Sequence, residues 1–139
     1  MNEAEIAGKC CKKMWENDLA SQDLGIQIKV KNQGSAVAFL EVKSNMVNGH
    51  DVCHGGYIFT LADTAFAFAC NTYNRITLAA SASIDFVRPG LLGDELVATA
   101  TEFHRGGRTG IYDVQVSNHK GQLIAIFRGR SYATQEPIL

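Results

Sequence analysis

The stretch Tyr57–Thr72, with the sequence YIFTLADTAFAFACNT, decides the fold of this chain. It is apolar nearly all round, which predicts a helix that is buried on all sides. A chain of 139 residues can bury such a helix only by wrapping a sheet around it. We therefore expect this helix to lie at the centre of the molecule.

The segments before and after this central helix predict a second helix and a sheet. Residues 2–24 have helical spacing, which predicts an N-terminal helix, and Gly25 is a suitable residue to end it. Other segments read as strands, several of them alternating apolar and polar residues. The predicted strands cover residues 26–30, 36–42, 78–88, 95–103, 111–117 and 123–132, with tight antiparallel links at 89–90 and 105–108. The expected fold is α+β, with an antiparallel sheet of about six strands around one long central helix and an N-terminal helix, in a single domain over residues 1–139.

Composition and charge exclude several classes of protein. The 13 basic and 14 acidic residues give a net charge of −1, without the basic excess of nucleic-acid-binding proteins. The four cysteines form no CxxC pair and no apolar leader precedes them, so we expect reduced thiols in a cytoplasmic protein that holds no metal. The longest apolar run is too short to cross a bilayer, so no membrane partner is expected. One helix cannot cover six strands, which predicts at least a homodimer and allows a tetramer.

Asp63 is the first candidate for chemistry. It is the only charged residue between His54 and Arg75, and it lies inside the apolar helix. A carboxylate costs several kcal/mol in such surroundings unless it is paired or hydrogen-bonded. Two interpretations stay open at this point: a catalytic carboxylate, or an ion pair with an arginine such as Arg88 or Arg128.

The triplet His54-Gly55-Gly56 immediately precedes that helix. Free backbone N–H groups at a helix start bind developing negative charge, and glycine lets a carbonyl approach the backbone closely. This pattern is typical of an oxyanion hole, although a simple glycine-rich connector has the same composition.

The loop Asn48–His54 allows three chemical interpretations. A metal site would use His50, Asp51, Cys53 and His54, but their spacing matches no common zinc pattern. Cys53 and His54 could form a nucleophile and base, but adjacent residues of an extended segment point to opposite sides. In the third interpretation Asn48 positions substrate or water.

Two further segments, 88–90 and 105–108, contain arginine and glycine. They could bind phosphate groups, or they could be turns whose charges are simply solvated.

At this point the sequence resembles the hotdog thioesterases of the phenylacetate-degradation (PaaI) type. The resemblance covers most of the chain and lies in an HGG triplet with an acid eight residues after its first glycine. The matching motifs are Asn48-Gly49-His50, Cys53-His54-Gly55-Gly56, Leu61-Ala62-Asp63-Thr64-Ala65, Ala69-Cys70-Asn71, Ile84-Asp85-Phe86-Val87-Arg88-Pro89-Gly90 and Phe127-Arg128-Gly129, with weaker likeness in Glu16-Asn17-Asp18 and Leu24-Gly25-Ile26.

The resemblance implies a role for each motif. Asp63 is the nucleophile or general base, Gly55 supplies the oxyanion N–H, and Asn48 orients water or the thioester. The site forms between two subunits of a dimer of dimers. His54, Gly56 and Tyr57 are then substrate-binding residues, and the coenzyme A nucleotide lies over Val87, Arg88, Pro89, Gly90, Arg105, Gly106, Gly107 and Arg108.

The chemistry agrees with this resemblance, because a thioester needs only one carboxylate, one oxyanion donor and one water. We therefore predict hydrolysis of an acyl-CoA, with phenylacetyl-CoA or a hydroxylated aryl-acetyl-CoA as the expected substrate and no cofactor. Tyr57, Phe59 and Phe66 are aromatic residues near the site, and Phe66 fits the core better. The alternatives are a hotdog hydratase or dehydratase using His54, and a non-catalytic acyl-CoA-binding module.

Overall fold

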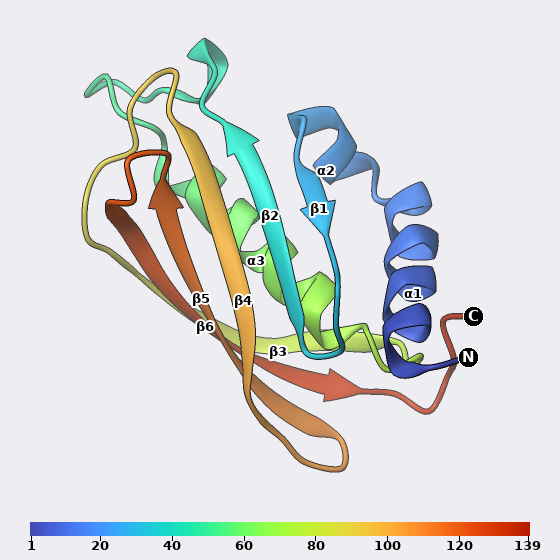
Figure 1. Cartoon of the computed structure of the whole chain (residues 1–139). Helices are drawn as coiled ribbons and strands as arrows, with labels where there is room; N and C mark the ends of the chain where they lie inside the picture. The colour runs from blue at the N-terminus through green and yellow to red at the C-terminus, as the bar shows by residue number, and fades with distance from the viewer.

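The computed structural model describes residues 1–139 and confirms an α+β architecture. One antiparallel sheet of six strands has the order β1-β2-β4-β5-β6-β3 and curves around helix α3 (Figure 1). The elements are α1 (Glu3–Asn17), α2 (Leu19–Leu24), β1 (Gln27–Lys29), β2 (Ser35–Glu41), η1 (Ser44–Met46), α3 (Gly55–Cys70), β3 (Thr77–Phe86), β4 (Glu95–Arg105), β5 (Thr109–Asn118) and β6 (Leu123–Ala133).

Helix α3 fills the concave side of the sheet. Its buried side chains, including Leu61 and Phe66, pack against inward-facing residues of β2, β4, β5 and β6 such as Val114 and Phe127. Gly129 of β6 allows the close approach, because a Cβ there would lie 2.8 Å from the Phe66 ring. None of the helices is long and apolar enough to span a membrane.

The N-terminal segment is two helices rather than the single predicted one. The chain leaves the helical conformation at Asp18, whose carboxylate accepts hydrogen bonds from the Ser21 N–H and hydroxyl at 3.0 and 2.7 Å. An aspartate that caps a new helix competes with continuation of the old one. Gly25 ends α2 with φ 78°, as predicted.

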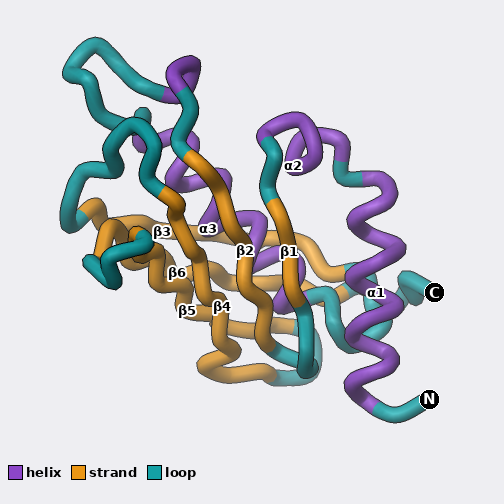
Figure 2. The backbone as a smooth tube through the Cα atoms, turned by 45° about the horizontal axis from the view of Figure 1, so that its top comes forward, coloured by secondary structure: helices purple, strands orange, loops and turns teal.

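The link at Pro89-Gly90 is not the predicted tight turn. Strand β3 pairs with β6 at one edge of the sheet, whereas β4 lies between β2 and β5. Residues 87–94 therefore cross from the edge strand to an inner strand (Figure 2). Proline and glycine predict a change of direction but not which strand the chain joins next. The link 105–108, in contrast, is the predicted hairpin between neighbours β4 and β5.

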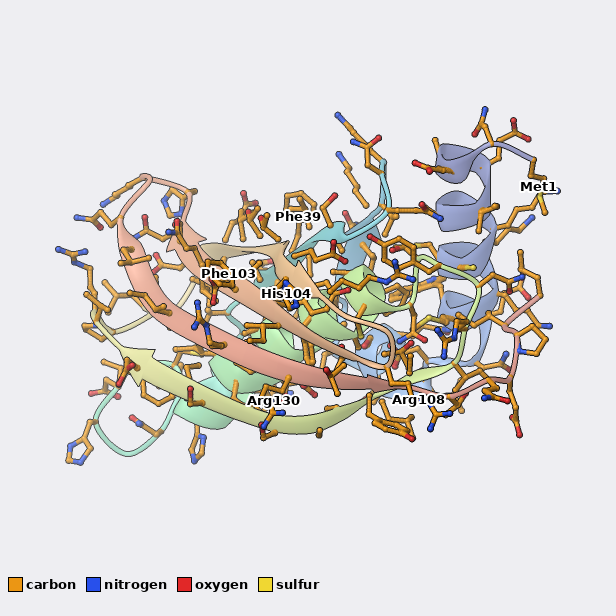
Figure 3. All side chains as sticks on the ribbon, turned by 90° about the horizontal axis from the view of Figure 1, so that it is seen from below. Met1, Phe39, Phe103, His104, Arg108 and Arg130 are labelled. Atoms are coloured by element: carbon orange, nitrogen blue, oxygen red, sulfur yellow. The ribbon has the colours of Figure 1, made fainter.

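The sheet does not bury α3 on all sides, contrary to prediction. Gly56, Thr60, Asp63 and Ala67, spaced four, three and four residues apart, form a stripe along α3 that stays partly exposed within one chain. Strand β3 is exposed in the same way, along nearly all of its ten residues. The opposite sheet face carries Phe39, Phe103 and Arg130 (Figure 3).

Candidate active site

Asp63 is an unpaired carboxylate halfway along α3. It makes no ion pair and no hydrogen bond within the chain, because the one salt bridge joins Arg128 to Asp113 and Arg88 donates to the Leu123 carbonyl oxygen at 3.1 Å. Neither Arg88 nor Arg128, the arginines of the predicted ion pair, contacts Asp63 within one chain. Partial burial raises the pKa of Asp63 above its usual value of 3.8 and so increases its basicity.

The N-terminus of α3 has one free donor. His54 is the N-cap, and its Nδ1 accepts a hydrogen bond from the Gly56 N–H at 2.9 Å. The Tyr57 N–H donates to the His54 carbonyl oxygen, while the Gly55 N–H donates to no group of the chain. Helix α3 thus begins at Gly55, two residues earlier than predicted, and Gly55 rather than Gly56 has an N–H available for a ligand.

The side chain of Asn48 is held in one orientation by its own loop. Its Oδ1 accepts hydrogen bonds from the N–H groups of His50 and Val52, at 2.9 and 3.4 Å. The Nδ2 group makes no hydrogen bond within the chain, so Asn48 presents its amide hydrogens as donors. This loop is joined to the start of α3, because the His54 N–H donates to the Met46 carbonyl oxygen at 2.8 Å.

One chain does not bring Gly55 and Asp63 together. They are eight residues apart on a straight helix, which corresponds to about 12 Å of rise. A thioester carbonyl cannot meet the Gly55 N–H and the Asp63 carboxylate of one chain at once, because each contact needs about 3 Å. A single chain therefore holds two half-sites: Asn48 with Gly55, and Asp63.

The other chemical interpretations of the loop lose support in the structure. Burial raises the pKa of the Cys53 thiol, and its Sγ lies 3.6 Å from the backbone oxygen of His54 rather than from a base. The histidines, cysteines and acids of this loop do not gather into a group that could hold a metal. The ring of His54 has no acidic partner, so the hydratase interpretation gains no support.

The two segments predicted to bind coenzyme A lie at opposite ends of the molecule. Gly90 is beside Leu96 at the start of β4, whereas Arg105 ends that strand. Nine residues of β-strand correspond to about 30 Å. In the hairpin, the Arg105 guanidinium stacks on the Tyr73 ring at 3.6 Å, and Arg75 donates to the Gly107 carbonyl oxygen at 3.1 Å.

Of the aromatic residues near the site, two pack into or against the core and two lie beside the start of α3. Phe66 is fully buried in the core, as predicted, and Phe59 packs edge-on against Phe127 at 5.4 Å. Tyr57 lies beside His54 at the helix start, with ring centroids 6.3 Å apart. Phe86 was missed by the sequence analysis, although its ring touches Gly55. No local pattern predicts a contact between residues so far apart in the chain.

Comparisons with known proteins agree with this geometry. The thioesterase superfamily profile matches residues 50–125. Over 119 residues, 86% of this chain and 85% of the relative, the sequence is 47% identical to the acyl-coenzyme A thioesterase PaaI of Escherichia coli (strain K12).

Two solved structures extend the comparison. The E. coli PaaI protein from the phenylacetic acid degradation operon has a TM-score of 0.95 and 42% identity, covering 98% of this chain and 99% of that one. A Streptococcus mutans protein bound to acetyl CoA has a TM-score of 0.77 and 27% identity, covering 81% and 90%.

Proposed function

The chain belongs to the thioesterase superfamily and is an acyl-CoA thioesterase of the hotdog fold, and we propose that Asp63 is its catalytic carboxylate. The observation that carries this proposal is that helix α3 has two polar groups without hydrogen-bond partners. Asp63 is a partly buried carboxylate without a partner, and Gly55 has a backbone N–H without an acceptor.

These groups divide the reaction between them. The Gly55 N–H donates to the thioester oxygen as it becomes negative, at the positive end of the α3 dipole. Asp63 either attacks the carbonyl carbon itself or accepts the proton of an attacking water. In both routes the C–S bond breaks and CoA leaves as a thiolate that takes up a proton. The water route releases the acid directly, whereas in the direct route a water molecule then hydrolyses the acyl–Asp63 anhydride to the free acid and the Asp63 carboxylate. The Asn48 amide hydrogens orient the water or the thioester, and His54 and Tyr57 lie beside it.

A complete site requires a second copy of the chain, because Gly55 and Asp63 are about 12 Å apart in one copy. Strand β3 offers the contact. It is a ten-residue edge strand with one charged residue, Asp85, and such an edge readily pairs with another strand. Antiparallel pairing of two β3 strands would bring the α3 stripe of each copy toward the other and cover Asp63 from water.

The same pairing offers an explanation for the separated coenzyme A segments. Antiparallel β3 strands place the Thr77 end of one copy beside the Phe86 end of the other. The hairpin 105–108 adjoins the Thr77 end through β6, and the segment 87–90 follows Phe86. One nucleotide would then contact Val87, Arg88, Pro89 and Gly90 of one copy and Arg105, Gly106, Gly107 and Arg108 of the other.

We further propose a dimer of dimers and an aryl-acetyl substrate. The outer sheet face carries exposed apolar side chains, among them Phe103 and Ile126, which a second dimer would cover. Phenylacetyl-CoA or a ring-hydroxylated form fits the similarity to a PaaI protein from a phenylacetic acid degradation operon. The four free cysteines fit a cytoplasmic enzyme, and the proposed reaction needs no cofactor.

A panel of thioesters tests this function. The protein is incubated with phenylacetyl-CoA, 3-hydroxyphenylacetyl-CoA, acetyl-CoA and palmitoyl-CoA, and thiol release is followed with a colorimetric reagent. We expect the aryl-acetyl substrates to have the highest kcat/KM. A preference for palmitoyl-CoA would overturn the aryl-acetyl proposal, and no thiol release from any substrate would contradict thioester hydrolysis.

A further inference from the structure

The ring of Phe86, rather than a positive φ, restricts the space for a side chain at residue 55. Gly55 has no positive φ, unlike Gly25, Gly34, Gly93 and Gly121. A Cβ at position 55 would instead lie 3.0 Å from Cζ and 3.3 Å from Cε1 of Phe86. The edge of the Phe86 ring therefore rests against the residue whose N–H is free.

Within one chain Phe86 is largely exposed, at the end of the strand that we propose to pair with a second copy. It is the last residue of β3 and is 55% exposed, with Val87 beside it 53% exposed. The ring is one wall of an open cavity of about 360 Å³ next to the helix start, and Gly55, Val87 and Arg88 also line this cavity. The ring thus lies between Gly55 and the cavity.

Three kinds of group meet in this cavity. Its lining combines the free N–H of Gly55, the apolar side chains of Phe86 and Val87, and the side chain of Arg88. Arg88 is fixed to the sheet through the Leu123 carbonyl oxygen at 3.1 Å. An acyl-CoA carries groups of the matching kinds: a polarised carbonyl, an uncharged pantetheine arm and phosphates.

We propose that Phe86 is a positioning residue that holds the pantetheine arm and so places the thioester carbonyl on the Gly55 N–H. This inference rests on the proposed function and assigns one part of the substrate to one side chain. Phe86 does not react. Its ring fixes the direction from which the carbonyl arrives, and misplacement of a reacting group by about 1 Å costs roughly 10²-fold in rate.

Kinetics of Phe86→Ala with full and truncated substrates test this role. The substrates are phenylacetyl-CoA, hexanoyl-CoA and phenylacetyl-N-acetylcysteamine, which lacks the nucleotide and most of the pantetheine arm. We expect kcat/KM to fall by about 10- to 100-fold for both CoA thioesters and by less than about threefold for the truncated one. Phe86→Leu, which keeps an apolar contact, should recover most of the loss.

Three results would overturn the proposal. A loss that differs strongly between phenylacetyl-CoA and hexanoyl-CoA would assign Phe86 to the acyl group. An equal loss for the truncated thioester would make Phe86 a structural support of Gly55, and an unchanged kcat/KM would give it no role. The wild-type protein in the same assay separates these outcomes from failure of the proposed function, since without thioesterase activity it would release no thiol from any of the three.

Gly55→Ala provides an independent check, because alanine keeps the backbone N–H. The new methyl group must displace the Phe86 ring, so we expect the single variant to lose at least about 10-fold in kcat/KM. The double variant Gly55→Ala, Phe86→Ala removes the collision and should be no less active than Phe86→Ala alone. Additive losses in this double-mutant cycle would contradict a direct contact between the two residues.

Discussion

The surroundings of Asp63 set its reactivity. Its carboxylate has no partner to neutralise it, and burial raises its pKa above 3.8. Both features make the ionised form a stronger base or nucleophile than a solvated aspartate. Both also cost folding free energy, so this residue favours function at the expense of stability.

Asp63→Asn should separate these two effects. We expect kcat to fall by about 10²- to 10⁴-fold in the thiol-release assay. Folding raises the pKa of Asp63, so its contribution to stability is present below the unfolded-state pKa and is lost as pH rises through the folded-state pKa. At pH 7 the variant should therefore have a higher Tm than the wild type, and the difference should vanish below about pH 4. A variant less stable than the wild type at pH 7 would contradict the unpaired state of Asp63.

Asn48→Asp tests the orientation of the neighbouring amide. A carboxylate at position 48 can still accept the hydrogen bonds of the His50 and Val52 N–H groups, so the loop should keep its structure. The variant lacks the Nδ2 donor and places a second carboxylate opposite Asp63 of the other copy, and we expect a loss of at least about 10²-fold in kcat with the fold of each chain retained. Near wild-type turnover would mean that the amide hydrogens of Asn48 do not take part in the reaction.

Sequence reasoning found the single residues that are chemically unusual but not how each is oriented. Asp63 was predictable because a lone charge in an apolar helix has a recognisable cost. The choice of the Gly55 over the Gly56 N–H came only from the family resemblance, because from the residues alone it depends on the direction of the His54 ring. The contact of Phe86 with Gly55 depends on the path of β3 across the fold.

At the scale of elements, the packing of β6 on α3 determines which way the partly exposed stripe of α3, which contains Asp63, faces. Gly129 has no side chain, so the backbone of β6 lies directly against the ring of Phe66. The two aromatic residues Phe66 and Phe127 then pack with ring centroids 5.8 Å apart. This close contact fixes the rotation of α3 about its axis and leaves Asp63 on the open side.

Gly129→Ala should therefore destabilise the fold. The new Cβ would lie 2.8 Å from the Phe66 ring in a fully packed core, and such overpacking costs about 1–3 kcal/mol. The matched control is Gly8→Ala in α1, where no atom lies within 4 Å and the helix should gain roughly 0.5–1 kcal/mol. Urea unfolding of both variants measures the two effects, and equal changes would contradict this account of the core.

Most elements could be predicted from periodicity, and the errors have physical causes. The six strands and the central helix follow from local patterns that each segment carries by itself. The break at Asp18 was missed because helical spacing continues on both sides of the capping residue. The crossing of residues 87–94 was missed because strand order depends on packing far from the link.

For the whole molecule, the free edge of β3 and the partly exposed stripe on α3 indicate one surface for contact with a second copy of the chain. A lysine at position 82 of β3 would lie near the proposed two-fold axis and face its own copy, and like charges in that position repel. We expect Ala82→Lys to raise the dimer dissociation constant at least about 10-fold in sedimentation equilibrium and to lower activity in parallel. Ala20→Lys on exposed α2 is the control and should change neither; activity in a monomeric Ala82→Lys variant would contradict a shared site.

Complementation between two inactive variants tests the shared site most directly. Asp63→Asn and Asn48→Asp chains are co-expressed with different tags, and the mixed dimers are purified through both. If Asp63 of one copy works with Asn48 and Gly55 of the other, each mixed dimer holds one doubly altered site and one intact site. The account predicts about half of the wild-type kcat per mixed dimer. Mixed dimers no more active than either parent would show that Asp63 and Asn48 act within one chain, and would contradict the central claim.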